Sequence, residues 1–132
     1  MEVLGIGVDV VEIARIERAM ARNEDFAARL FSPRERRRCE AFSRPARRYA
    51  ACFAAKEAAG KALGTGLRGV DWKEMELLED GEGRPVLHLS GRALQLARSL
   101  GVEKILVSIS HTGELAVALA QAMGERKRGC AG

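Results

Sequence analysis

The chain has 132 residues, of which 47% are hydrophobic and 5% aromatic, and it carries a formal net charge of +4. This length and composition predict a single globular domain and exclude wholesale disorder. No basic segment followed by a long apolar core opens the sequence, and no apolar stretch is long enough to cross a bilayer. We therefore expect a cytoplasmic protein without a membrane partner.

Basic residues are concentrated in one segment. Residues 29–48 contain eight arginines against two glutamates, a charge of +6, so the rest of the chain carries −2. Such a block predicts either an acidic partner (nucleic acid, a nucleotide or an acidic protein) or simply a solvated helix face. The cysteines Cys39, Cys52 and Cys130 form no CxxC pattern and predict free thiols in a reducing compartment.

The first part of the chain predicts one strand followed by helices. Residues 2–8 are rich in Val, Leu and Ile and predict a buried strand that ends at Asp9. Apolar residues at helical spacing predict a helix over 12–22, and a second, short helix is expected to end at Leu30. The run Ser32-Pro33-Arg34-Glu35 has a serine cap, a proline and a glutamate at the third position, which is typical of a helix start.

A long helix and a hairpin follow. We expect a helix over 45–63 that stops at Gly64. Residues 70–79 and 85–89 flank the turn at 80–83, and this pattern predicts a β-hairpin.

The last part of the chain predicts one helix and two strands. A serine cap predicts a helix over 90–100, and the β-branched run over 103–110 predicts a central strand. Alanine content favours a helix over 115–123, but the tight turn before it favours a hairpin partner, so we predict a strand. The domain is expected to cover 1–123, with a basic, flexible tail over 124–132.

Asp9 closes the run Gly5-Ile6-Gly7-Val8-Asp9 at the expected exit of the first strand. Functional side chains collect at such exits because the strand holds them rigidly. An aspartate there is nevertheless more often a turn former or a helix cap. The two glycines before it allow another backbone or a ligand to come close.

Glu57 and Lys61 lie four residues apart in the helix expected over 45–63, so they share one face. They form either a simple ion pair, which stabilises by about 0.3–0.5 kcal/mol, or part of a site. The surrounding alanines and Gly60 keep the helix slim, so it packs on the sheet and draws both charges into a partly buried setting. Asp9 and Glu57 with an ammonium nearby suit a hard cation and a phosphate. The pattern therefore predicts magnesium-assisted phosphoryl chemistry.

Other motifs are weaker. Residues 64–69 match GxGxxG, but this motif follows a helix and precedes a strand, the reverse of a dinucleotide site. His111 follows Ser108 and Ser110 at a strand end and raises the alternative of a nucleophilic serine. Because adjacent strand residues face opposite sides, Ser108 and Ser110 share one face and His111 belongs to the other, so a histidine and hydroxyls that hold a phosphate are favoured instead. His88, within the hairpin, is expected to be structural or exposed.

Taken in order, these motifs resemble one family over about residues 3–123. Three stretches of this sequence resemble the bacterial holo-acyl-carrier-protein synthases, which are the short, single-repeat class of 4′-phosphopantetheinyl transferases. These stretches are Gly5-Ile6-Gly7-Val8-Asp9 followed by Arg15, Phe53-Ala54-Ala55-Lys56-Glu57-Ala58 with Lys61 and Gly64-Thr65-Gly66, and Ser108-Ile109-Ser110-His111. The paired motifs at this separation are specific, unlike either half alone.

The resemblance implies an α+β fold, a small antiparallel sheet with helices packed on it, and one family repeat per subunit. It implies a homotrimer with active sites at subunit interfaces. The implied reaction moves the 4′-phosphopantetheine arm of coenzyme A to a serine of apo acyl carrier protein, with Mg²⁺ as cofactor. Adenosine 3′,5′-bisphosphate is released, and the holo carrier serves fatty-acid synthesis.

Carried over residue by residue, the resemblance makes Asp9 and Glu57 the magnesium ligands. Lys61 would contact the pyrophosphate and neutralise or protonate the departing phosphate, and Glu57, directly or through a metal-bound water, would accept the serine proton. The residues implied to bind the coenzyme are Lys61, Gly64, Ser108, His111 and Thr112. The residues implied to bind the carrier protein are Arg15, Arg22, Phe26 and Phe53.

Two positions depart from the family pattern. Cys52 stands where the family commonly has arginine, which weakens a basic contact to the nucleotide phosphates, and Arg47 or Arg48 is the candidate substitute. At Asp25 a basic residue is frequent in relatives, so the pattern that docks the carrier is expected to differ here.

The sequence allows two alternative functions. The arginine block suits a nucleic-acid-binding domain. The sequence, however, has neither the aromatic platform expected for single strands nor an obvious groove-reading motif, and nucleic-acid binding would leave Asp9 and Glu57 unexplained. A magnesium-dependent phosphodiesterase would use water in place of the carrier serine as acceptor. We therefore expect no nucleic-acid partner.

Overall fold

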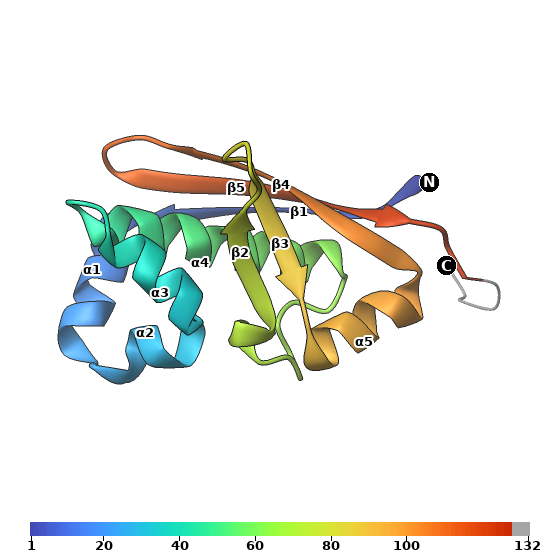
Figure 1. Ribbon diagram of the computed structural model, residues 1–132, viewed down its shortest axis with the longest axis horizontal. Coiled ribbons are helices and arrows are strands. Elements are labelled where there is room, and N and C mark those ends of the chain that lie inside the picture. The colour runs from blue at the N-terminus through green and yellow to red at the C-terminus, as the bar shows by residue number, and fades with distance from the viewer. Residues whose placement is uncertain (128–132) are drawn as a thin grey trace.

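The computed structural model describes residues 1–127 and has the expected α+β fold. Its strands are β1 (Glu2–Glu12), β2 (Met75–Glu79), β3 (Pro85–Leu89), β4 (Val102–His111) and β5 (Leu115–Gly124). Its helices are α1 (Ile13–Arg22), α2 (Asp25–Leu30), α3 (Pro33–Glu40), α4 (Pro45–Ala62) and α5 (Gly91–Leu100), with a 3₁₀ turn, η1 (Trp72–Glu74), before β2. Strands β1, β5 and β4 form one layer, α4 runs beneath it, and α1, α2 and α3 lie together near one end (Figure 1).

The larger sheet is antiparallel, in the order β1-β5-β4. β1 pairs with β5 as far as Glu12, so Asp9 lies within the strand and not at its exit. The expected strand end at Asp9 is therefore wrong, because Val10 and Val11 continue the alternation of exposed and buried residues. Asp9 projects from the same face as the buried Val11.

The central strand of this sheet is β5, although its sequence is rich in alanine. Its fully buried residues are Ala116, Ala118, Ala120 and Ala122. They share the face that packs on α4, where small side chains let a helix approach closely. The strand expected over 115–123 is confirmed, whereas the β-branched strand expected to be central is the edge strand β4.

Two glycines of β1 allow the backbone of α4 to lie directly on the strand. A β-carbon added to Gly5 would lie 1.9 Å from the carbonyl oxygen of Ala62, and one added to Gly7 would lie 2.0 Å from that of Ala58. No side chain tolerates such distances, so only glycine fits at these positions. The contact places α4 directly beside Asp9.

Local sequence signals predicted several other elements. Ser32 and Glu35 form the reciprocal capping box that begins α3, and Gly101 ends α5 at a φ of 82°. The hairpin of β2 and β3 is confirmed. Its first strand begins later than expected, at Met75, because Asp71 caps the 3₁₀ turn in front of it.

The end of the chain is only partly described. β5 continues to Gly124, the first residue of the segment expected to be a flexible basic tail. Residues 128–132, which make up most of that segment, lie outside the described residues. Within residues 1–127, no helix is long and apolar enough to cross a membrane.

No helix or strand covers the face of the larger sheet that points away from α4 (Figure 1), and this face carries exposed apolar side chains. Val10, for example, remains 56% exposed. The large exposed side chains of this outer face are Ile6, Val8 and Val10 of β1, Leu119 of β5 and Leu106 of β4. An apolar surface of this kind marks an interaction site in soluble proteins.

We expect Gly7→Ala to destabilise the protein by about 1–3 kcal/mol, because the added methyl group must push β1 away from α4. Gly81→Ala is the matched control, since nothing lies within 4 Å of a β-carbon added in that turn. Urea denaturation of both variants and the parent protein makes the comparison. Equal unfolding midpoints for the two variants would contradict the close approach of β1 and α4.

Candidate active site

Asp9 of β1 and Lys61 of α4 are in direct contact. The Lys61 ammonium lies 3.3 Å from Oδ1 of Asp9 and donates a 2.9 Å hydrogen bond to the carbonyl oxygen of Val8. Among the described residues, Lys61 therefore pairs with the acid of β1 and not with Glu57, the partner that helix spacing allowed. The Asp9 side chain is only 18% exposed, whereas that of Lys61 is 52% exposed. The ammonium thus keeps one side open to a ligand.

Glu57 is close enough to Asp9 for the two carboxylates to affect each other. Burial raises the pKa of the Glu57 carboxyl above its ordinary value, the negative charge of Asp9 raises it further, and the Lys61 ammonium lowers it. A cation bound between the two acids would relieve this repulsion. Two coupled carboxylates at a partly open surface are typical of a functional site.

The donor set suits a hard divalent cation that takes its other ligands from a substrate. Asp9 and Glu57 offer carboxylate oxygens, and the part of the chain that the structure describes has no group of three or more His, Cys, Asp or Glu side chains that could hold a metal. Mg²⁺ is commonly bound by one or two carboxylates together with substrate phosphates and water. The residues present therefore fit this ion, and Lys61 adds positive charge for a phosphate.

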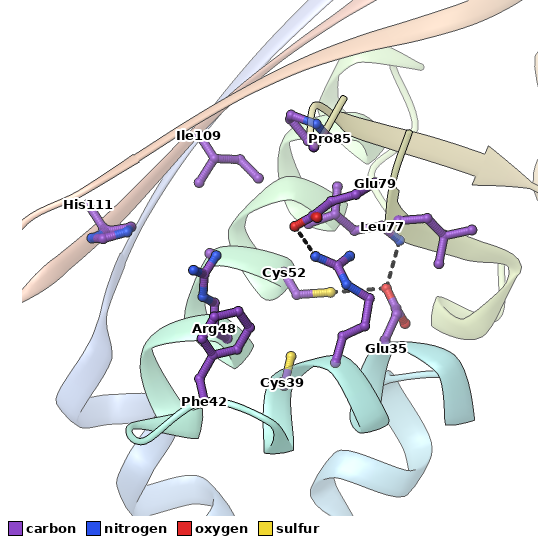
Figure 2. Close-up of a pocket in the computed structure, with 14 residues that line it drawn as sticks. Glu35, Cys39, Phe42, Arg48, Cys52, Leu77, Glu79, Pro85, Ile109 and His111 are labelled. Carbon is purple, nitrogen blue, oxygen red and sulfur yellow. Dashed lines mark hydrogen bonds and ion pairs between the residues drawn. The ribbon is translucent and has the colours of Figure 1, made fainter. Parts of the chain in front are cut away.

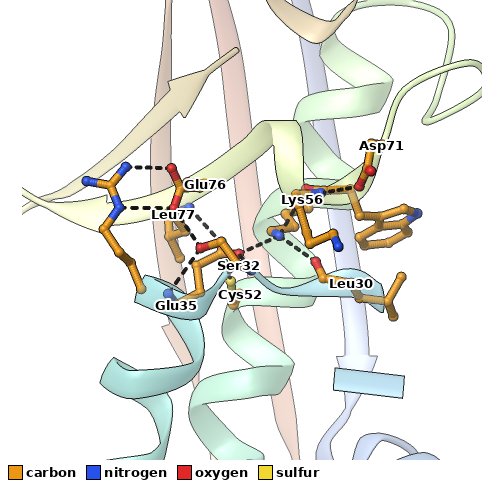
Figure 3. Close-up of polar contacts among 11 residues, drawn as sticks. Leu30, Ser32, Glu35, Cys52, Lys56, Asp71, Glu76 and Leu77 are labelled. Atoms are coloured by element: carbon orange, nitrogen blue, oxygen red, sulfur yellow. Dashed lines mark hydrogen bonds and ion pairs between the residues drawn. The ribbon is translucent and has the colours of Figure 1, made fainter. Parts of the chain in front are cut away.

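Lys56, the residue before Glu57 on α4, forms a fully buried ion pair with Glu35 of α3 (Figure 3). The Lys56 ammonium lies 2.6 Å from Oε1 of Glu35 and donates to the carbonyl oxygens of Leu30 and Trp72, at 2.6 and 3.0 Å. Removing one partner of such a pair costs about 3–5 kcal/mol, because the other charge is left buried and unpaired.

The other oxygen of Glu35 is also occupied. Oε2 accepts hydrogen bonds from the amide of Leu77 at 2.8 Å and from the thiol of Cys52 at 3.0 Å, so this carboxylate joins α3, α4 and β2. Since Lys56 faces Glu35, the next residue, Glu57, is turned by about 100° around the helix, toward β1. No motif in the sequence predicts this pair; the available signal is that Lys56 lies in phase with the buried Cys52 four residues earlier.

His111 lies on the other flank of α4, in a pocket of about 200 Å³ (Figure 2). α4 lines this pocket with Arg48 and Cys52. Arg48 and Glu57 are nine residues apart, or about two and a half helical turns, so they project from opposite sides of α4. A single chain therefore does not bring His111 to the pair of Asp9 and Glu57.

The pocket around His111 is lined by apolar side chains together with two arginines, Arg38 and Arg48, and two acids, Glu35 and Glu79. The Arg48 guanidinium lies 3.8 Å from the centre of the Phe42 ring, a cation–π contact. Cys52 contributes no positive charge, and burial raises the pKa of its thiol well above the usual value. Of the two arginines that are candidates to replace the family's arginine, Arg48 lines the pocket, whereas Arg47 is not among its lining residues.

The other residues predicted to bind the coenzyme are dispersed. Ser108 pairs with Leu119 on the outer face of the sheet and so points away from α4, whereas His111 is on the α4 face. This placement gives no support to a Ser–His nucleophile within one chain. Gly64 follows α4 at a φ of 84°, and the Thr112 hydroxyl accepts two backbone hydrogen bonds within the β4–β5 turn.

The residues predicted to bind the carrier lie on three neighbouring helices, α1, α2 and α4. Phe26 of α2 stacks on Phe53 of α4, with ring centres 6.5 Å apart, and Arg15 and Arg22 are exposed on α1, which packs against α4. Phe53 precedes Glu57 by about one turn of α4, so these two side chains are neighbours on the helix.

Two carboxylates that can hold Mg²⁺, with a lysine beside them, suit chemistry on a phosphate group. Residues 5–120 match the model of the 4′-phosphopantetheinyl transferase superfamily, and the chain belongs to that superfamily.

Named relatives and solved structures agree with this assignment. The chain is 51% identical over 120 residues to the holo-[acyl-carrier-protein] synthase of Anaeromyxobacter dehalogenans, covering 88% of this chain and 92% of the relative. It is 45% identical over 119 residues to that of Alkaliphilus oremlandii, covering 90% and 98%. The synthase structure from Neisseria meningitidis has a TM-score of 0.86 at 30% identity, with 92% and 99% covered. The synthase–coenzyme A complex from Chronobacterium ammoniagenes has a TM-score of 0.82 at 34% identity, with 95% and 100% covered.

We expect Asp9→Asn to lower the pKa of the Glu57 carboxyl, because it removes a neighbouring negative charge, and Lys61→Met to raise it. NMR titration of the Glu57 carboxyl without divalent cations measures both shifts. A raised carboxyl pKa favours the protonated form, so the stability that this group contributes is lost as pH rises through that pKa. An unchanged titration in both variants would show that the three groups are not coupled.

Proposed function

We propose that this chain is a holo-acyl-carrier-protein synthase, which transfers the 4′-phosphopantetheine arm of coenzyme A to a serine of apo acyl carrier protein. The proposal depends on one observation: Asp9, Glu57 and Lys61 lie close together in a member of the 4′-phosphopantetheinyl transferase superfamily. Relatives named for this activity and a neighbour solved with coenzyme A support it. In this proposal the enzyme acts in the cytoplasm and supplies holo carrier for fatty-acid synthesis.

Asp9 and Glu57 are the proposed ligands of Mg²⁺, which when bound supplies positive charge for the pyrophosphate of coenzyme A. The serine oxygen forms a bond to phosphorus while the bond to adenosine 3′,5′-bisphosphate breaks. Glu57 takes the serine proton as the general base. Lys61, whose ammonium is half exposed beside Asp9, neutralises the departing phosphate. Few residues suffice, because phosphoryl transfer depends mainly on positioning and charge.

A homotrimer completes the site in this proposal. One chain holds His111 and the two acids on opposite flanks of α4, so a cavity that contains both needs a second copy. The uncovered apolar face of the sheet gives the copies a surface to bury, and head-to-tail contacts between identical chains can close into a ring. The nucleotide end of coenzyme A then lies between copies, along His111, Ser108 and Thr112, with Gly64 near the pyrophosphate.

The carrier protein docks on α1 and α2 in this proposal. Arg15 and Arg22 supply positive charge for an acidic carrier helix, and Phe26 and Phe53 supply apolar contact. Opposite charges on the two partners speed their encounter and fix their orientation. The carrier serine thereby reaches Glu57, one turn from Phe53 on α4.

We expect Glu57→Ala to reduce transfer by at least about 100-fold while the fold is kept, because the variant lacks both a metal ligand and the proton acceptor. The protein is incubated with apo carrier, coenzyme A and Mg²⁺, and the carrier is weighed by mass spectrometry. Glu103→Ala, which removes an exposed acid of β4, is the control. Undiminished transfer by Glu57→Ala at saturating Mg²⁺ refutes its role, and cleavage of coenzyme A without labelled carrier would indicate a phosphodiesterase.

Val10→Glu on the outer face of the sheet is expected to convert the trimer to monomers and to abolish transfer, since a charge cannot be buried there unpaired. Size-exclusion chromatography with light scattering measures the mass. Val86→Glu, at an exposed position of β3, is the control and should leave the trimer intact. A parent protein that is monomeric and fully active would contradict the shared site.

A further inference from the structure

Phe53 and Glu57 are partly exposed in a stretch of α4 that is otherwise buried. Every other residue from Ala51 to Gly60 is buried. The two side chains are four residues apart, so they lie on the same face of the helix. A molecule that brings a hydroxyl group to the Glu57 carboxyl therefore also meets the Phe53 ring.

The segment that follows α4 folds back along this helix. The Gly66 amide donates a 3.0 Å hydrogen bond to the carbonyl oxygen of Gly60, and a β-carbon added to Gly60 would lie 2.9 Å from the carbonyl carbon of Gly66. About two turns earlier on α4, the Trp72 ring packs on Phe53, with ring centres 4.9 Å apart. Residues 66–72, the returning segment, therefore run from Gly60 back to Phe53.

Glu57 lies between the returning segment and β1. Phe53, Glu57 and Gly60 follow one another at spacings of four and three residues, so they share one face of α4. A glycine of β1 contacts α4 at Ala58 and Lys61, which lie to the other side of Glu57 around the helix. Glu57 therefore has β1 on one side and the returning segment on the other.

Hydrogen bonds fix the backbone around Trp72. The buried Lys56 ammonium donates to the Trp72 carbonyl oxygen at 3.0 Å and to that of Leu30, the last residue of α2, at 2.6 Å (Figure 3). Asp71 caps the turn η1 and accepts a 2.9 Å hydrogen bond from the amide of Lys73. A side chain on a fixed backbone has less conformational freedom to lose when it binds a partner.

Three aromatic rings form a continuous apolar strip that passes Glu57. Phe53 contacts both Trp72 of η1 and Phe26 of α2. All three side chains are partly exposed, so the strip offers apolar surface to a partner. Trp72 extends this strip beyond the two rings that are proposed to contact the carrier protein.

We propose that Trp72 is a carrier-binding residue, whose ring contacts apolar side chains around the acceptor serine of the carrier. This inference rests on the proposed function, in which the carrier docks on α1 and α2 and its serine reaches Glu57. A carrier placed in this way covers Phe53 and, with it, the Trp72 ring that Phe53 contacts. Buried tryptophans are among the residues that contribute most to binding at protein interfaces.

The uncharged pantetheine arm of coenzyme A is the other molecule that such a strip could receive. The carrier is favoured because the strip leads away from α4 to Phe26 on α2, beside α1, on which Arg15 and Arg22 are exposed. Two exposed guanidinium groups suit an acidic protein and find no partner in an uncharged arm.

Trp72 is the only tryptophan of the chain, so its fluorescence reports on this contact. Adding an apo carrier that lacks tryptophan to the parent protein, without coenzyme A, should shift the Trp72 emission to shorter wavelength, because the ring loses contact with water. Coenzyme A alone should leave the emission unchanged. A shift with coenzyme A and none with the carrier would overturn the inference and assign the ring to the pantetheine arm.

Trp72→Ala is expected to raise the KM for the carrier by about tenfold and to leave kcat and the KM for coenzyme A close to those of the parent protein. Trp72→Phe should recover most of the loss, because it keeps an aromatic ring. Val86→Ala, which removes an exposed apolar side chain of β3 outside the strip, is the control. A lower kcat, or equal increases in both KM values, would indicate a purely structural role and overturn the inference.

Alanine variants of the carrier locate the contact. The apolar residues exposed around its acceptor serine are replaced one at a time, and each variant is tested with the parent protein and with Trp72→Ala. The penalty of Trp72→Ala should disappear with at least one carrier variant, because the contact is then already lost. An undiminished penalty with every carrier variant would contradict a direct contact.

A carrier KM for Trp72→Ala equal to that for Val86→Ala would overturn this inference and leave the proposed function standing. Absence of transfer by the parent protein would overturn the proposed function, so the two failures are distinguishable.

Discussion

The carbonyl oxygens of Ala58 and Ala62 on α4 occupy the space that side chains at Gly7 and Gly5 of β1 would fill. This backbone contact decides where the chemistry of the molecule lies. It places the Lys61 ammonium beside the Asp9 carboxylate, and it brings the Glu57 carboxyl close enough for the charge of Asp9 to raise its pKa. Repulsion between the Asp9 and Glu57 carboxylates makes an unfavourable contribution to the folding free energy, and a bound cation would relieve it.

The rotation of α4 is set on its other side, by the buried pair of Lys56 and Glu35. A buried ion pair is weak evidence for stability, because an apolar pair of similar size often serves as well or better. Its effect here is geometric. Because every oxygen of Glu35 is occupied and the Lys56 ammonium has three acceptors, the helix is held with Glu57 turned toward β1.

Local patterns in the sequence predicted local structure. The capping box at Ser32 begins a helix, and the tight turn before residues 115–123 predicted a strand that the structure confirms. Features set by distant contacts were not predictable. Whether β1 stops at Asp9 depends on its pairing with β5, and the choice of Asp9 over Glu57 as the partner of Lys61 depends on glycine contacts across the core. The position of His111 on the opposite flank of α4 from Asp9 and Glu57 likewise follows from the topology of the chain, which no motif encodes.

A single divalent cation held jointly by Asp9 and Glu57 is the feature on which the proposed activity depends. Electron paramagnetic resonance of Mn²⁺, titrated into the protein with coenzyme A present, measures this binding directly. The parent protein should bind about one Mn²⁺ per chain, since two carboxylates and substrate phosphates complete one site. Asp9→Asn and Glu57→Gln should each remove most of that binding. Unaltered Mn²⁺ affinity in both variants would contradict the account.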